Sequence, residues 1–226
     1  MTDALMRLHV DALFTRDARG DLLRINEPNG GPAPRFFLGQ TTEGLVLRFR
    51  GDVGEETRRD LADAASLEVL NDLPATPETY QEILGNTAPV EKTWSGPVFS
   101  FPAALASGDE TILITDANTH YLERHLSAWL GDVHSCAPLI ALVIEDSAVA
   151  ICGSVRITDH ACEAGVETTA SARGHGYAGR VASGWARAIR AEGKTPLYST
   201  SWDNDASRAV ARKLGLTQFG TDLHIT

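Results

Sequence analysis

One segment of this sequence, Arg173-Gly174-His175-Gly176-Tyr177-Ala178, combines glycines and polar residues in a way that could bind an anion. It lies between residues 161–169, an apolar stretch typical of a strand, and residues 177–190, an amphipathic stretch typical of a helix. Glycines in a strand-to-helix loop leave backbone N–H groups unpaired at the positive end of the helix dipole, and they place no Cβ between those groups and a ligand. The loop therefore predicts a site for a phosphate-bearing cofactor.

Two common phosphate-binding patterns fit this loop poorly. Gly174, Gly176 and Gly179 satisfy the spacing G-x-G-x-x-G of the dinucleotide fingerprint. That fingerprint also needs an acidic residue about 20 positions on, at the end of a second strand, whereas Lys194 is followed by residues 196–202 without an acidic side chain. The sequence G-x-x-x-x-G-K-[ST] of a P-loop does not occur. A nicotinamide-dependent dehydrogenase is therefore a rival hypothesis, which a failure to bind NAD would exclude.

A third pattern does fit. The form Arg-x-x-Gly-x-Ala, from Arg173 through Gly176 to Ala178, resembles the pyrophosphate loop of the GNAT (GCN5-related) acetyltransferases. In that family the loop binds the pyrophosphate of acetyl-CoA. The resemblance therefore implies acetyl-CoA as the co-substrate.

A second segment carries the same resemblance. A predicted strand from residue 196 is followed by Asn204, a short predicted helix and the exit Leu214-Gly215-Leu216. This order is similar to the second GNAT motif, in which a strand leads into a helix that begins with Asn and ends in a Leu-Gly-hydrophobic turn. Together the two motifs cover the sequence from residue 161 to its end.

The resemblance also implies which residues hold the cofactor. Backbone groups on the strand before the loop would hold the pantetheine and polarise the thioester, the loop amides would hold the pyrophosphate, and Arg173 would brace the loop. Asn204 and the start of its helix would contact the pantetheine or the adenine end. The implied cofactor-binding residues are Val166, Glu167, Thr168, Arg173, Gly174, His175, Gly176, Tyr177, Ala178, Asn204 and Ser207.

Glu163 and Glu167 are the candidates for the general base. They lie four residues apart on the predicted strand, and alternate side chains of a strand share a face. A carboxylate near the thioester could take the proton of the attacking amine, directly or through water. Glu167 is closer to the loop and is the preferred candidate, although either carboxylate could simply cover the solvent face of the strand.

The candidate acid departs from the family pattern. Many GNAT members have a tyrosine seven residues after the Asn of the second motif, where it can protonate the leaving thiolate, but this sequence has Ala211 there. Tyr198, Ser199 or water are the substitutes, and Tyr198 also fits a core position. A dedicated acid is not essential, because a free thiol has a pKa of about 8.5 and its thiolate is a tolerable leaving group.

The composition excludes several classes of protein. The net charge of −10 over 226 residues argues against a nucleic-acid partner; it suits a basic amine acceptor or serves solubility. No apolar run approaches the roughly 20 residues that cross a bilayer, and the N-terminus lacks a signal-peptide core. Cys136, Cys152 and Cys162 show no metal-ligand spacing and are predicted to be reduced and buried. We expect a cytoplasmic protein without a metal or membrane contact.

Apolar periodicity and turn residues predict the elements that position these groups. In the C-terminal half we expect a helix over 118–130 capped by Asp116 or Asn118, a hairpin of strands 138–144 and 148–157, strand 161–169, helix 177–190 closed by Gly193, strand 196–201, helix 205–214 and strand 218–225. In the N-terminal part we expect strands 8–15 and 21–25, a hairpin of strands 35–40 and 44–50, helices 55–70 and 76–84, and strand 94–101.

These elements indicate an α/β protein with a mixed sheet: a GNAT-like acyl-CoA-binding domain, residues 106–226, preceded by an α+β module, residues 1–105. The expected activity is transfer of an acetyl group from acetyl-CoA to an amine by direct attack in a ternary complex. The alternative is a non-catalytic acyl-CoA-binding or regulatory module, which turnover with any amine would exclude. The acceptor and the acyl-chain length stay open. We expect the N-terminal module and residues 118–130 to shape the acceptor side, and a homodimer is the default expectation.

Overall fold

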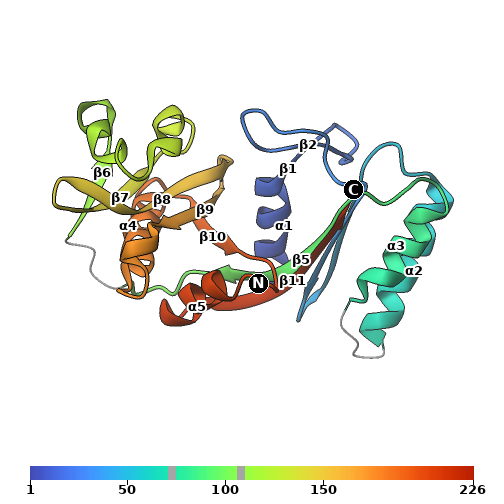
Figure 1. Cartoon of the computed structure of the whole chain (residues 1–226). Coiled ribbons are helices and arrows are strands. Elements are labelled where there is room, and N and C mark those ends of the chain that lie inside the picture. The colour runs from blue at the N-terminus through green and yellow to red at the C-terminus, as the bar shows by residue number, and fades with distance from the viewer. Residues whose placement is uncertain (71–74, 106–109) are drawn as a thin grey trace. The chain divides into compact units, whose positions relative to one another are not determined.

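The computed structural model describes residues 1–70, 75–105 and 110–226, which form two compact units (Figure 1). Unit 1 consists of Met1–Val98, Thr200–Asp203 and Gln218–Thr226, and unit 2 consists of Phe99–Ser199 and Asn204–Thr217. The domain boundary predicted between residues 105 and 106 adjoins residues outside the described part of the chain. The division into residues 1–105 and 106–226 stays a prediction.

Unit 1 contains a sheet with the strand order β4-β3-β11-β5 and helices on both of its faces. Its elements are α1 (Thr2–Leu13), β1 (Phe14–Arg16), β2 (Leu22–Ile25), β3 (Phe36–Thr41), β4 (Gly44–Phe49), α2 (Glu55–Leu70), α3 (Pro77–Gly85), most of β5 (Thr93–Ser100) and most of β11 (Thr217–Ile225). The predicted hairpin of β3 and β4 and the predicted helices α2 and α3 are confirmed. Alternate residues of β3 lie on opposite faces of the sheet. Phe36 and Leu38 pack against α2 and α3, whereas Gly39 faces Met6 of α1.

The first element of unit 1 corrects the prediction of a strand over residues 8–15. Residues 2–13 form α1, and a strand begins only at Phe14. Met6, Val10 and Leu13 recur three and four residues apart, and all three are buried, so their spacing fits one face of a helix. Tertiary contacts also hold this helix: the Nε2 atom of His9 lies 2.7 Å from the Asp222 carboxylate on β11, and both side chains are fully buried.

Unit 2 contains a mixed sheet with the strand order β10-β9-β8-β7-β6. Its elements are β6 (Thr111–Ile114), the 3-10 helices η1 (Asp116–Leu122) and η2 (Ser127–Asp132), β7 (Leu139–Ile144), β8 (Ser147–Ile157), β9 (Ala161–Thr168), the 3-10 turn η3 (Ala170–Ala172), α4 (Tyr177–Ala191), β10 (Thr195–Ser199) and α5 (Asp205–Lys213). Neighbouring strands are antiparallel except β9 and β10, which are parallel. The mixed α/β fold predicted from the sequence is confirmed, and β6 is a strand that the sequence pattern missed.

Helix α4 covers one face of the sheet in unit 2 (Figure 1). Its apolar residues occupy one stripe, and Val181, Trp185 and Ile189 have no exposed surface. The indole N–H of Trp185 donates to Ser154 Oγ at 3.0 Å, so this tryptophan is a core residue with a satisfied donor. At the end of this helix, Arg190 donates to the backbone carbonyls of residues 101, 102 and 103.

The opposite face of this sheet is covered by η1 and η2, and here the predicted helix over residues 118–130 is wrong. Asn118 has φ −137° and ψ 21°, outside the helical region, and its side chain accepts from Thr115 N at 2.7 Å and donates to Leu113 O at 2.9 Å. Such local bonds compete with a continuous helix and leave two short 3-10 segments. The N-cap is Thr115 rather than Asp116 or Asn118. Leu122 and Leu126 are nevertheless buried against the sheet.

Candidate acyl-CoA site

The glycine loop before α4 adopts the backbone conformation that its sequence predicts. Gly174 has φ +84° and Gly176, the N-cap of α4, has φ +79° and ψ 8°. L residues other than glycine rarely adopt this left-handed region, because their Cβ then approaches the following carbonyl oxygen. The third glycine, Gly179, lacks a positive φ, and a Cβ there would make an ordinary contact with Leu214 Cδ2 at 3.5 Å, so neither the backbone nor the packing requires glycine at this position.

This conformation leaves a cluster of unpaired amides at the start of α4. The N–H groups of residues 174–178 donate to no acceptor among the described residues, whereas those of Gly179 and Arg180 donate to Gly176 O at 3.1 and 3.4 Å. Five successive N–H groups at the positive end of a helix of 15 residues can together receive an anion. The loop therefore has the unpaired backbone amides that the predicted anion site needs, and the binding of an anion there stays a prediction.

The side chains around the loop leave the amides open. His175 turns its ring back onto the loop, where Nδ1–H donates to the carbonyl of Arg173 at 3.0 Å, and the ring stacks on Tyr177 at 5.4 Å. The Arg180 guanidinium lies 5.6 Å from the centre of the Tyr177 ring and pairs with Glu110. Arg173 is exposed, and its guanidinium makes no hydrogen bond or ion pair with any residue in the described part of the chain. Its predicted bracing of the loop stays a prediction.

Strands β9 and β10 separate beside this loop. They pair in parallel only from Ala161 opposite Thr195 to Glu163 opposite Leu197. Strand β9 then continues to Thr168 while remaining paired with β8 on its other edge. Within the described residues, the β10-facing edge of residues 164–168 therefore has no ladder partner, and an extended ligand can use such an edge as an added strand would. The hydroxyl of Thr168 is buried and has no hydrogen-bond partner in the part of the chain that the structure describes.

The two candidate bases lie on one face of β9, as predicted. Cys162, Ala164 and Val166 pack in the core beneath α4, so the alternate residues Glu163 and Glu167 lie on the other face. Their surroundings differ. Glu163 is only 1% exposed, at the last pair before the strands separate, and accepts from Ser199 Oγ at 3.3 Å. Glu167 is exposed and accepts from the indole N–H of Trp129 at 2.7 Å.

The candidate acid lies on the opposite face. Tyr198 is 4% exposed within the core beneath α4, and burial raises the pKa of its hydroxyl. That hydroxyl lies 2.7 Å from Ser207 Oγ, and Ser207 N donates to Asn204 Oδ1 at 3.0 Å. Asn204 is thus the N-cap of α5, and the structure brings Asn204, Ser207 and Tyr198 together to join β10 to this helix. Ala211, in the place of the family tyrosine, is buried in the same core.

Comparisons with known proteins agree with this fold. The model of the FR47-like protein family, which is related to the GNAT acetyltransferases, matches residues 148–224. Two solved GNAT-family acetyltransferases resemble most of the chain: one from Colwellia psychrerythraea (TM-score 0.51, 13% identity, 86% of this chain and 81% of that chain) and one from Sphaerobacter thermophilus (0.50, 11%, 90% and 79%). A third GNAT-family structure, from Novosphingobium aromaticivorans, has a TM-score of 0.50 at 15% identity. That match covers 60% of this chain and only 65% of the length of the Novosphingobium protein.

The C-terminal half of this chain has the GNAT fold. The resemblance predicted from its two motifs is thereby confirmed. The Colwellia and Sphaerobacter matches cover more of the chain than the C-terminal half can supply, so the similarity extends into the N-terminal part, where the sequence shows no GNAT pattern. No curated protein matches the sequence significantly.

Two features of the GNAT half escaped the sequence prediction. Trp129, within the predicted helix over residues 118–130, lies instead on η2 and donates its indole N–H to Glu167. Gly153 and Gly165 lie opposite each other on β8 and β9, and a Cβ at either would come within 3.0 and 3.3 Å of the Trp129 ring. A pair of glycines in neighbouring predicted strands is a weak signal, because the register of the strands must be known before the pair can be seen.

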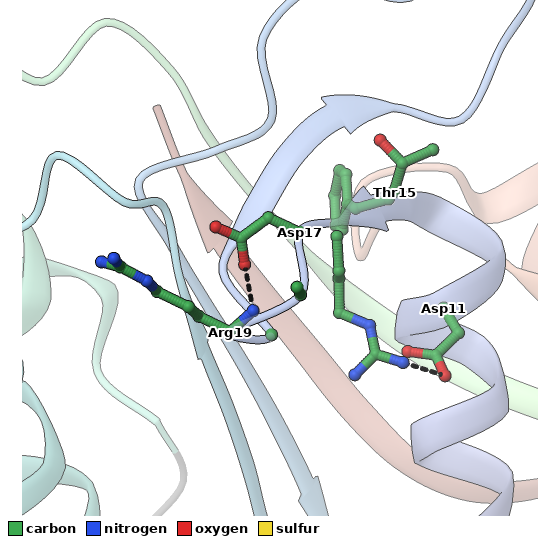
Figure 2. A pocket seen from close by; sticks show the side chains of 8 residues that line it. Asp11, Thr15, Asp17 and Arg19 are labelled. Atoms are coloured by element: carbon green, nitrogen blue, oxygen red, sulfur yellow. Dashed lines mark hydrogen bonds and ion pairs between the residues drawn. The ribbon is translucent and has the colours of Figure 1, made fainter.

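Unit 1 also has a hollow, at the end of α1 and the turn between β1 and β2 (Figure 2). Within it Arg16 pairs with Asp11 at 2.7 Å, and the Asp17 carboxylate accepts from Arg19 N at 2.8 Å. Burial raises the pKa of Asp11, against the opposing effect of the Arg16 charge. These contacts are those of a polar turn, and none of the lining residues is a predicted site residue. No helix among the described residues is long and apolar enough to cross a membrane, and none of their His, Cys, Asp and Glu side chains form a metal-binding group of three.

Proposed function

We propose that this protein is an N-acetyltransferase that moves the acetyl group of acetyl-CoA to an amine. The observation that carries the proposal is the set of five unpartnered amides at residues 174–178, at the start of a helix that packs on the separating strands of a GNAT fold. Pyrophosphate is the part of acetyl-CoA that such amides can receive, and the free edge of β9 suits the amides of its pantetheine.

In this proposal each predicted residue has a task. The amides of Gly174, His175, Gly176, Tyr177 and Ala178 hold the pyrophosphate, and Arg173 braces the loop. The backbone of Val166, Glu167 and Thr168 holds the pantetheine, and Asn204 and Ser207 keep the start of α5 in place beside it. Acetyl-CoA supplies the activated thioester when bound.

The base in the proposal is Glu167. It is exposed, so an amine can reach it, and it lies on the free part of β9 beyond the last pair with β10. Glu163 is buried and bonded to Ser199, which suits it to hold a water or orient the strand edge rather than to meet the amine directly. Direct attack in a ternary complex needs no residue that forms a covalent intermediate.

A non-catalytic acyl-CoA-binding module is the second candidate, and one observation favours it. The Tyr198 hydroxyl is buried on the face opposite the two carboxylates, and the family tyrosine is replaced by the buried Ala211. An enzyme built this way lets the thiolate leave without a tyrosine acid, whereas a binding module has no need of one. The acceptor, the acyl-chain length, a homodimer and a cytoplasmic location stay predictions.

The test is calorimetric titration of acetyl-CoA and of NAD into the protein, followed by a screen of amines for release of free CoA thiol. Micromolar binding of acetyl-CoA without binding of NAD supports the acyl-CoA site. Thiol release that depends on an amine then supports the enzyme and excludes the binding module. Absence of acetyl-CoA binding would overturn the proposal.

A further inference from the structure

The indole of Trp129 packs against two glycines on neighbouring strands of the sheet in unit 2. Gly153 on β8 and Gly165 on β9 are cross-strand partners. A Cβ at Gly153 would lie 3.0 Å from Trp129 Cζ3, and a Cβ at Gly165 would lie 3.3 Å from Trp129 Cη2. Both distances are tighter than most contacts, so a side chain at either position would shift the indole by a few tenths of an ångström. It would also press on Leu139 Cδ1 at 2.6 Å from Gly153 and on Val155 Cγ1 at 2.2 Å from Gly165.

The segment that carries Trp129 is tied to the same sheet. Leu126, Val133 and Cys136, on either side of it, belong to the apolar cluster beneath η1 and η2. Ser154 N on β8 donates to Cys136 O at 2.8 Å, and Trp129 N donates to Leu126 O at 3.0 Å. The indole therefore has a position set by packing and by backbone hydrogen bonds, which is what a positioning group needs.

From this position the indole reaches the candidate base. Trp129 Nε1–H, the only donor of that side chain, lies 2.7 Å from Glu167 Oε2, and the two residues are 38 positions apart in the sequence. The other carboxylate oxygen, Oε1, has no donor among the described residues. One oxygen is thus held while the second keeps its lone pairs for an incoming proton.

We infer that Trp129 is a positioning residue for proton removal: its indole N–H holds the exposed carboxylate of Glu167 in the orientation that accepts the amine proton. An exposed glutamate has several rotamers of similar energy, and holding it in one of them raises the fraction of complexes in which the base can react. The inference rests on the proposed function and extends it to a residue outside the two GNAT motifs.

The main test is the substitution Trp129→Phe, which keeps a ring over the two glycines and removes the donor. The control is Trp185→Phe, which likewise removes an indole N–H bond but lies in the core on the other face of the sheet. We expect Trp129→Phe to lower kcat for thiol release about 10- to 100-fold, with the Kd for acetyl-CoA unchanged. We expect no further loss when Trp129→Phe is added to Glu167→Gln, because the group that it orients is already gone.

A second measurement tests the hydrogen bond between Trp129 and Glu167 independently of enzyme activity. The ¹H–¹⁵N signal of the Trp129 indole, assigned by its loss in Trp129→Phe, should move in Glu167→Gln, since a carboxylate acceptor becomes an amide, and should stay in place in Glu163→Gln. Any one of three results would overturn the inference. The first is a kcat that Trp129→Phe leaves unchanged, and the second is a kcat for the double variant that falls by the product of the two single losses. The third is an indole signal whose position is the same in Glu167→Gln as in the unmodified protein. Absence of acetyl-CoA binding or of turnover in the unmodified protein would instead overturn the proposed function, and the positioning role with it.

Discussion

The two ends of α4 offer a matched pair of substitutions that tests the pyrophosphate site. Gly176 precedes the helix with φ +79°, and Gly193 follows its C-cap with φ +77°. A Cβ at either position would meet no other atom within 4 Å. Gly176→Glu and Gly193→Glu therefore introduce the same side chain, the same charge and nearly the same backbone strain, about 1–2 kcal/mol each. They differ in which end of the helix receives the carboxylate.

The helix dipole separates the effects of the two substitutions on stability and on binding. A carboxylate at the N-terminus is favoured and one at the C-terminus disfavoured, each by about 0.3–1 kcal/mol. Gly176→Glu should therefore be the less destabilised variant. It nevertheless places a competing anion beside the five unpartnered amides of residues 174–178. Loss of acetyl-CoA binding in this variant could then not be attributed to unfolding.

The expected loss follows from the number of amides that the new carboxylate occupies. A hydrogen bond to a charged group contributes about 1.5–3 kcal/mol. If the carboxylate excludes the pyrophosphate from two of the five amides, binding weakens by about 3–6 kcal/mol, which is about 10²- to 10⁴-fold in Kd. Repulsion between the two anions adds to this loss, so micromolar binding should become undetectable.

The assay is calorimetric titration of acetyl-CoA into the unmodified protein and both variants, with the thermal midpoint of each measured beside it. We expect Gly193→Glu to bind as the unmodified protein does and Gly176→Glu to lose binding at a midpoint equal to or above that of Gly193→Glu. Equal Kd values in the two variants would refute the reasoning, because the amides at the start of α4 would then not hold the ligand.

Three further predictions concern single side chains. Glu167→Gln should abolish most amine-dependent thiol release while the calorimetric Kd for acetyl-CoA stays the same; an active variant would exclude this carboxylate as the base. Asp222→Ala should lower the free energy of unfolding by about 3–5 kcal/mol in urea titrations, because it leaves His9 buried without its carboxylate, and a loss under 1 kcal/mol would contradict this. Ser183→Ala should raise the free energy of unfolding by about 1 kcal/mol, since the Ser183 hydroxyl is buried without a partner among the described residues; a destabilised variant would show that the hydroxyl is satisfied.

Much of the C-terminal half could be predicted because its signals are local. The apolar stripe of α4, the left-handed glycines before and after it, and the Asn204 cap of α5 each involve residues within a few positions of one another. Hydrogen bonds that close within one turn depend little on the rest of the chain, so their residues specify them directly.

The two wrong predictions of secondary structure concern residues 8–15 and 118–130, where other contacts override the preference read from the local apolar pattern. Residues 8–15 read as a strand, yet Met6 and His9 pack into contacts with β3 and β11 that only a helix beginning at residue 2 can make. Residues 118–130 have a helical apolar spacing, but the side chain of Asn118 takes up backbone groups that a continuous helix would need.

The candidate site divides in the same way. The sequence alone determined the left-handed glycine loop before α4, the shared face of Glu163 and Glu167, and the GNAT fold of the C-terminal half, because loop conformation and strand alternation are properties of neighbouring residues. Only the tertiary structure decided that Glu163 is buried while Glu167 is exposed and held by Trp129. That difference depends on where β10 leaves β9 and on what packs over a pair of glycines, and both are set by side chains brought together from distant positions in the chain.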